Sequence, residues 1–124
     1  MAENEKKGEL AASKLSKVYV YEEARTISGT DNTTLKAKPL KAGEVVIIEY
    51  FSVVDIDTAN KTLRLGYDRA GTKYWLRREA AGTAGYGLTL ATPLILAENE
   101  APCAMIESPT TLDDVLVVAR GRYL

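Results

Sequence analysis

The stretch from Gly43 to Asp57 reads GEVVIIEYFSVVDID and is a dense run of strand-forming residues. Most of its side chains are β-branched or aromatic, and such side chains pack well on a pleated surface. Turn-forming residues flank the run on both sides. Alternate positions from Val46 to Ile56 are mainly apolar, whereas the positions between them mix apolar and acidic residues. We therefore predict one long strand, bent near Ser52, with one face toward a core and the other toward water or a partner.

Strand signals recur through the rest of the chain from Lys17 onward, at a spacing of about 8–12 residues. Pro93 interrupts one of these segments, which predicts a broken strand or one at a sheet edge. We identify no internal repeat and no helix beyond residue 16. The pattern is typical of an all-β sandwich or barrel. Besides the long strand, the predicted strands cover residues 18–22, 25–28, 33–38, 62–68, 73–78, 88–96, 102–107 and 115–122.

The composition is that of a single folded domain. The chain has 124 residues, 46% of them hydrophobic and 27% charged, which is enough for a hydrophobic core. Sixteen basic residues balance seventeen acidic ones, which argues against binding nucleic acid or an anionic membrane through net charge. The single cysteine, Cys103, excludes a disulfide within the chain, and we predict that it is buried. The absence of histidine excludes Ser-His-Asp and Cys-His catalysis and histidine-ligated metals.

No catalytic or metal-binding motif in the sequence is complete. Residues 55–60 partly match a calcium loop, but Ala59 takes the place of an oxygen ligand, and the required glycine and glutamate are missing. Glu107 with Asp113 and Asp114 is a second acidic set, for which a solvated loop before a strand is the simpler interpretation. We therefore predict no enzyme activity, no metal and no cofactor.

Residues 1–16 differ from the rest because they are charged and rich in alanine. Leu10 and Leu15 mark one face of a helix that is too short to be stable alone. Two interpretations stay open: a mobile tail, or an arm whose Leu10 and Leu15 contact a neighbouring subunit. No stretch reaches the ~20 apolar residues that span a bilayer. The N-terminus also lacks the apolar segment of a secretory signal, so we expect the protein in the cytoplasm where it is made.

The long strand and the two strands after it predict an antiparallel meander. We pair Asp57 with Thr62 around the first turn, and Asp68 with Lys73 around the second. A shift of one residue would turn the whole apolar set toward solvent. The core face of this meander then contains Val54, Ile56, Leu63, Leu65, Tyr67, Tyr74 and Leu76.

The opposite face of the predicted meander combines aromatic and basic residues. Gly66 lies opposite Trp75, whose ring covers the bare backbone. Arg64 falls beside Arg77, which is unfavourable unless an anion lies between them. Three interpretations stay open: a solvated face, a contact surface for another protein, since Trp and Arg anchor interfaces, and a platform for a sugar or single-stranded nucleic acid. The candidate binding surface consists of Trp75, Arg64, Arg77, Lys73 and Phe51.

Three segments carry a resemblance to a known family. Residues 39–44, PLKAGE, lead into the long strand; residues 94–96 precede the acidic turn 97–100; and residues 113–121, DDVLVVARG, close the chain. This order resembles the small jelly-roll capsid decoration or cement proteins of tailed bacteriophages. The resemblance implies an antiparallel, jelly-roll-like β-sandwich over residues 17–124, often trimeric, that reinforces a capsid lattice with the help of an N-terminal arm at residues 1–16. It assigns no functional residue.

Together these observations favour a non-enzymatic virion structural protein. We expect a homotrimer that binds the major capsid protein or other virion proteins through its arm and the Trp75 surface, and that is assembled into the virion in the host cytoplasm. The alternative is a carbohydrate-binding or adhesion module that uses Trp75, Tyr67 and Tyr86. An enzyme would have to work with Asp, Glu, Lys, Tyr or Ser alone, because the chain has no histidine.

Overall fold

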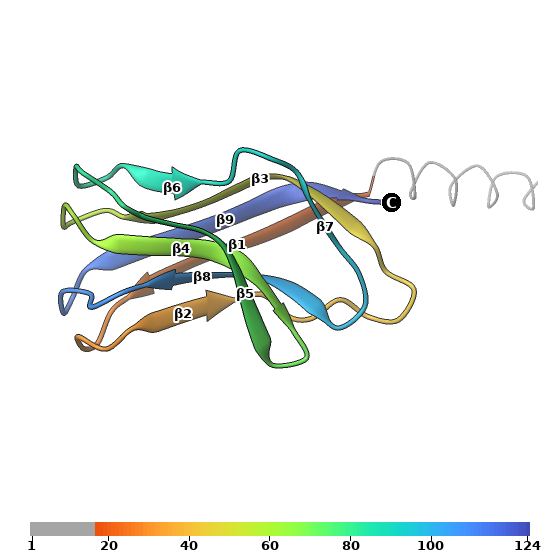
Figure 1. Ribbon diagram of the computed structural model, residues 1–124, viewed down its shortest axis with the longest axis horizontal. Helices are drawn as coiled ribbons and strands as arrows, with labels where there is room; N and C mark the ends of the chain where they lie inside the picture. Colours follow the sequence, from red (N-terminus) through yellow and green to blue (C-terminus); the bar gives the residue numbers. More distant parts are fainter. Residues whose placement is uncertain (1–16) are drawn as a thin grey trace, which may run out of the picture.

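The protein, described here by a computed structural model over residues 17–124, consists of two antiparallel sheets packed face to face (Figure 1). One sheet has five strands in the order β1-β9-β3-β6, with β7 also paired to β3, and the other has four in the order β2-β8-β4-β5. No helix within residues 17–124 is long and apolar enough to cross a membrane. The strands are β1 (Val18–Thr26), β2 (Thr33–Lys36), β3 (Val46–Asp55), β4 (Thr62–Arg69), β5 (Thr72–Ala80), β6 (Gly87–Thr89), β7 (Leu94–Leu96), β8 (Glu100–Ile106) and β9 (Asp114–Tyr123).

The strand order is that of a jelly roll. β6 and β7 pair with the two halves of β3 and act as one edge strand, interrupted around Pro93 as the sequence predicts. Counted in this way, eight strands form two four-stranded sheets, and most connections cross from one sheet to the other. The prediction of an antiparallel, jelly-roll-like β-sandwich is therefore confirmed.

The core lies between the two sheets, and a bulge in β3 decides which of its residues reach it. Val46 and Ile48 point inward, but Glu49 is an extra residue, after which Phe51 and Val53 point inward. The predicted place of Phe51 on the outer surface is wrong, because its side chain is only 1% exposed. The largest fully buried side chains are Phe51, Ile27, Leu35, Ile48, Leu63, Leu65, Leu96 and Ile106, with four valines.

The bulge also reverses the predicted inward and outward positions in the second half of β3. The predicted core residues Tyr50 and Ile56 are exposed. β9 provides the matching feature, since Gly121 lies opposite Ile48 and a side chain at Gly121 would overlap the backbone carbonyl of Ile47. The bulge therefore lies opposite a glycine that is distant in the sequence.

The predicted pairing of β3 with β4 is wrong. The two strands belong to different sheets, because β9 occupies one edge of β3 while β6 and β7 occupy the other. The connecting turn does not close a hairpin: Asp55 accepts hydrogen bonds from the backbone N–H groups of Asp57 and Thr58, and Asn60 N–H donates to Ala81. The chain is thereby directed across to the second sheet.

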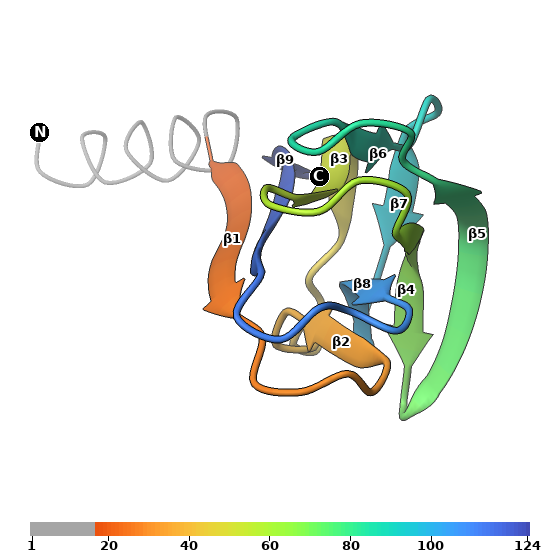
Figure 2. The same ribbon diagram turned by 90° about the vertical axis from the view of Figure 1, so that its left-hand side faces the viewer.

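The predicted hairpin of β4 and β5 is confirmed at its turn. Asp68 pairs with Lys73 around Ala70 and Gly71, which both adopt positive φ, the conformation of a tight two-residue hairpin loop. Beyond Trp75, however, Leu76 is an extra residue in β5. Figure 2 shows β5 at the outer edge of its sheet.

This second bulge corrects the rest of the predicted meander. Leu65 pairs with Arg77 instead of Leu76, and Arg64 pairs with Arg78. Leu63 and Leu65 are in the core as predicted, whereas Leu76 is 49% exposed.

Candidate functional site

The outer face of the four-stranded sheet holds part of the predicted binding surface. Trp75 lies opposite Gly66, where a side chain would overlap the backbone of Tyr74 and Trp75. The Arg64 guanidinium lies 5.8 Å from the centre of the Trp75 ring, close enough for a cation–π contact. Lys73 lies on the same face, two positions before Trp75 in β5. The structure thus brings Trp75, Arg64 and Lys73 together, while Phe51 is in the core.

Arg77 is not part of this face. Its guanidinium donates to the backbone carbonyl of Thr89 in β6, which belongs to the other sheet, and to the Glu79 carboxylate at 2.6 Å. Because the bulge at Leu76 reverses its direction, Arg77 points across the open edge of the sandwich. The prediction that Arg77 lies beside Arg64 is therefore wrong.

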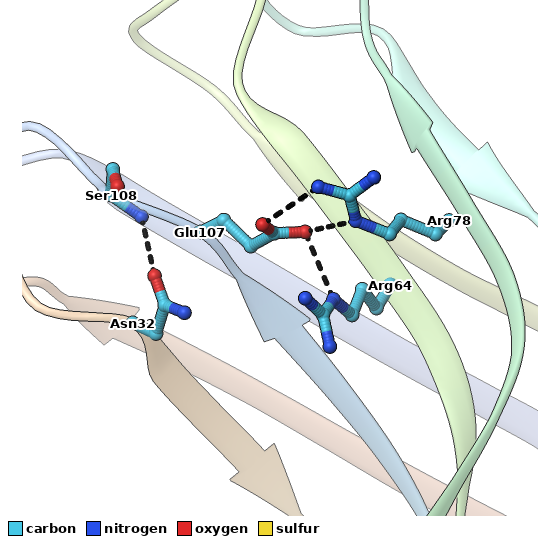
Figure 3. A network of polar contacts seen from close by, with 5 residues as sticks. All are labelled: Asn32, Arg64, Arg78, Glu107 and Ser108. Atoms are coloured by element: carbon cyan, nitrogen blue, oxygen red, sulfur yellow. Dashed lines mark hydrogen bonds and ion pairs between the residues drawn. The ribbon is translucent and has the colours of Figure 1, made fainter.

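Arg78 takes that place instead, and Glu107 is the anion between the two arginines (Figure 3). Glu107 Oε2 accepts hydrogen bonds from Arg64 Nε at 2.9 Å and Arg78 Nε at 2.6 Å, and Oε1 accepts one from Arg78 Nη2 at 3.0 Å. These hydrogen bonds lower the pKa of Glu107 from its ordinary 4.5 to about 2. Asn32 Oδ1 accepts the neighbouring N–H of Ser108 at 2.9 Å and ties the loop after β8 to the loop before β2 (Figure 3). One carboxylate thus offsets part of the positive charge of the two arginines.

Asp68 offsets part of the positive charge at the other end of the same face. It is buried and lies 3.9 Å from Lys36 and 3.7 Å from Lys73, and it accepts a hydrogen bond from the Gly71 N–H at 3.0 Å. Cys103 is buried as predicted, and burial, followed by the charge of Asp68, raises the pKa of its thiol to about 12. A thiol with this pKa is not a reactive nucleophile at neutral pH.

The outer face of the five-stranded sheet is very different, and we call it the apolar face. Its side chains come from β1, β3, β7 and β9, whose registers place them on one surface. Val18, Val20 and Ile95 are 64%, 55% and 61% exposed. The residues of the apolar face are Val18, Val20, Ala24, Ile47, Tyr50, Val54, Ile95, Leu116 and Val118.

Two ion pairs lie across the apolar face and cancel its charge. Arg120 contacts Glu22 at 2.6 Å, and Arg122 contacts Glu49 at 3.0 Å. The sequence prediction missed this surface. The available signal was the uninterrupted run VLVV at 115–118, because consecutive apolar residues in a strand place apolar side chains on both sides of a sheet.

The remaining candidates from the sequence are dispersed. Leu10 and Leu15, with the whole predicted arm at 1–16, lie outside the described residues. The aromatic residues of the sugar-binding alternative do not form one platform. Tyr67 stacks on Tyr74 with ring centres 5.1 Å apart and lies on the opposite side of the sheet from Trp75, whereas Tyr86 lies in the loop before β6.

Two hollows lie near the start of β1 and the end of β9, with volumes of about 480 and 530 Å³. Lys17, Glu44 and Tyr123 line both of them. Among the described residues, Glu44 is the one acid in either lining, so neither hollow presents the pair of carboxylates that general acid–base hydrolysis uses.

Three aspartates meet at one end of the sandwich. Carboxylate oxygens of Asp55, Asp57 and Asp113 all lie within 4.8 Å of one another. Burial, and then the contact with Asp113, raise the pKa of Asp55 above its ordinary value. The sequence contains these residues in two separate acidic segments, and only the pairing of β3 with β9 brings them together.

Comparison with known proteins identifies no relative in sequence: no protein-family model and no curated protein match the chain. Among solved structures, the chain is similar to part of dimeric latent PorU from Porphyromonas gingivalis, with 16% sequence identity and a TM-score of 0.36. The match covers 86% of this chain and 13% of the PorU chain, so the chain spans a small part of PorU. This likeness assigns neither a family nor a function.

Proposed function

We propose that the protein is a non-enzymatic structural module that attaches to a larger protein assembly through its apolar face. The class that fits best is a capsid decoration or cement protein of a tailed bacteriophage, with its place in the virion. The observation that carries the proposal is the exposure of Val18 and Val20 on β1 and of Ile95 on β7. These residues lie on the same outer face of the five-stranded sheet, with Arg120, Arg122 and Ile47 between them. Soluble monomers rarely expose large contiguous apolar patches, and such patches mark interaction sites.

The charge pattern of the apolar face supports a protein as the partner. Its two arginines are already paired with Glu22 and Glu49, so no excess positive charge is available for phosphate groups. An apolar centre with a few satisfied polar groups is the usual anatomy of a protein–protein interface. The partner on this proposal is the major capsid protein or another virion protein, or a second copy of the chain in a homotrimer.

The Trp75 surface supports this role less well. Arg64 and Arg78 are engaged by Glu107, and Lys36 and Lys73 flank Asp68. Binding a partner there would require these ion pairs to be rearranged or desolvated, which often costs as much as it returns. The carbohydrate-binding alternative lacks a shared aromatic platform, and no observation favours it over assembly.

The test compares Val20→Glu with Leu76→Glu, because both residues are exposed and apolar but Leu76 lies on β5, away from the apolar face. We expect the unmodified protein to co-sediment with undecorated capsids of its phage or to form a trimer by light scattering. Val20→Glu should abolish the association, and Leu76→Glu should leave it intact. A monomeric protein that never co-sediments with capsids would refute the proposal, as would unchanged association of the Val20→Glu variant.

A further inference from the structure

The three aspartates at the end of the sandwich are held in place by backbone hydrogen bonds. Asp55 ends β3, and its Oδ1 accepts hydrogen bonds from the N–H of Asp57 at 2.9 Å and of Thr58 at 3.1 Å. Asp57 Oδ2 accepts the N–H of Asp114, the first residue of β9, at 2.7 Å. The backbone N–H of Ile27 donates to the Asp113 carbonyl at 2.8 Å and holds the other half of the cluster. Backbone N–H groups therefore fix the carboxylates of Asp55 and Asp57, and a backbone hydrogen bond fixes the main chain at Asp113.

Two oxygens inside this cluster have no partner among the described residues. Asp55 and Asp113 are 2% and 5% exposed, and the Oδ2 atom of each is buried without a hydrogen bond. Two ionised carboxylates cannot hydrogen-bond to each other, since both are acceptors only. No arginine or lysine within residues 17–124 forms an ion pair with either of them.

Buried, unpaired carboxylates are costly, and proteins that retain them neutralise them by a proton or by a metal ion. A shared proton would satisfy Asp55 and Asp113 alone. It would not involve the third carboxylate, Asp57, which the N–H of Asp114 holds next to the other two. Asp57 is exposed, so the cluster is buried on one side and open to water on the other.

We propose that Asp55, Asp57 and Asp113 form a binding site for a divalent cation of the calcium class. All the donor atoms are carboxylate oxygens, which hard cations prefer over softer metals. Oxygens that all lie within 4.8 Å of one another can each reach a single cation with Ca–O distances of about 2.4 Å. The exposed side leaves room for the water ligands that complete six to eight contacts.

The site would connect the end of β3 to the loop before β9. These segments are far apart in sequence, and the Asp57 and Asp113 carboxylates approach each other only in the folded protein. A cation that binds the folded but not the unfolded chain raises the melting temperature as its concentration increases. The inference is independent of the proposed function, because it concerns the stability of the isolated module and not its partner.

The experiment uses the full chain, stripped with EDTA and then titrated with CaCl₂, with MgCl₂ and with NaCl at matched ionic strength. Isothermal titration calorimetry should report one Ca²⁺ per chain, and the melting temperature should rise with Ca²⁺ but not with Na⁺. Asp113→Asn should weaken binding by at least about tenfold, because it removes a ligand charge. The matched control is Asp31→Asn, since Asp31 is an exposed aspartate outside the cluster and the variant should bind like the unmodified chain.

A second variant, Asp57→Asn, separates a loss of Ca²⁺ binding from a failure to fold. Asp57 is exposed, so Asp57→Asn should fold normally while still weakening Ca²⁺ binding. The proposal is overturned if the stripped protein shows no binding heat and no Ca²⁺-dependent shift in melting temperature. It is also overturned if Asp57→Asn and Asp113→Asn bind Ca²⁺ as the unmodified chain does. A response to Mg²⁺ at lower concentration than to Ca²⁺ would overturn the calcium assignment.

Discussion

The two outer faces of this sandwich differ in the side chains that they expose. On the four-stranded sheet, long charged side chains pair around Asp68 and Glu107, and Trp75 pairs with Gly66 and contacts Arg64. On the five-stranded sheet, short β-branched side chains such as Val20 leave the apolar surface open. Long side chains can fold over their own sheet, whereas valine cannot. The difference shows that ion pairs within the monomer cover much of one face, whereas exposed apolar side chains remain on the other, where we propose that a second molecule binds.

The largest expected effect on stability comes from adding a side chain at Gly66, on the outer face of the four-stranded sheet. Gly66→Ala places a methyl group against the Tyr74 carbonyl oxygen. Because this oxygen belongs to the backbone of β5, relieving the clash requires a shift of the strand. We expect a loss of about 3 kcal/mol of unfolding free energy, at the upper end for overpacking. Urea denaturation followed by Trp75 fluorescence measures this loss. Gly29→Ala is the control, because nothing lies within 4 Å of the added atom, and an equal loss in both variants would contradict the argument.

Replacing Glu107 should have a smaller effect on the free energy of unfolding, and this effect should depend on pH. The pKa of Glu107 lies near 2 in the folded protein and at its ordinary 4.5 without its arginine partners. A lowered folded-state pKa means that the stabilisation is fully present above pH 4.5 and is lost as the pH falls from 4.5 toward 2. Glu107→Gln should therefore be less stable than the unmodified protein at neutral pH, with the difference disappearing in acid.

Acid denaturation of both proteins across this range measures the Glu107 contribution. Glu79→Gln is the matched control, because Glu79 is an exposed partner of a single arginine, Arg77. If the unfolding free energies of Glu107→Gln and the unmodified protein differ by the same amount down to pH 2, Glu107 does not act through its charge.

The smallest effect on folding is expected on the apolar face. Val18→Thr and Val20→Thr keep β-branched side chains at exposed strand positions, so each should change the unfolding free energy by less than about 0.5 kcal/mol. At dilute, monomeric concentrations, chemical denaturation measures this directly. A loss comparable to that of Gly66→Ala would mean that these valines support the fold and not association, and would remove the contrast between the faces.

The sequence predicted local structure well because local signals control it. Alternating residues located nearly all the strands, Pro93 marked the break between β6 and β7, and the Ala70–Gly71 turn set the register of β4 against β5. These features depend on the backbone preferences of neighbouring residues, so the sequence alone predicts them.

The sequence prediction was wrong where a strand contains one extra residue or where a side chain contacts a residue that is distant in the sequence. Glu49 and Leu76 are bulge residues, and each reverses the direction of the residues after it, which moved Phe51 into the core and Arg77 to the sheet edge. A bulge changes side-chain direction without changing composition, so periodicity alone does not reveal it. Glu107 likewise reached Arg64 and Arg78 only through the pairing of β8 with β4.

By itself, then, the sequence determined an all-β chain, the positions of its strands and one hairpin, because each of these follows from interactions between near neighbours. The tertiary structure decided which sheet each strand joined, which face stayed apolar and which aspartates met. Those outcomes depend on hydrogen bonds between strands that are distant in sequence, such as β3 with β9. Any strand edge offers the same backbone donors and acceptors, so only the packing of the whole chain selects the partner.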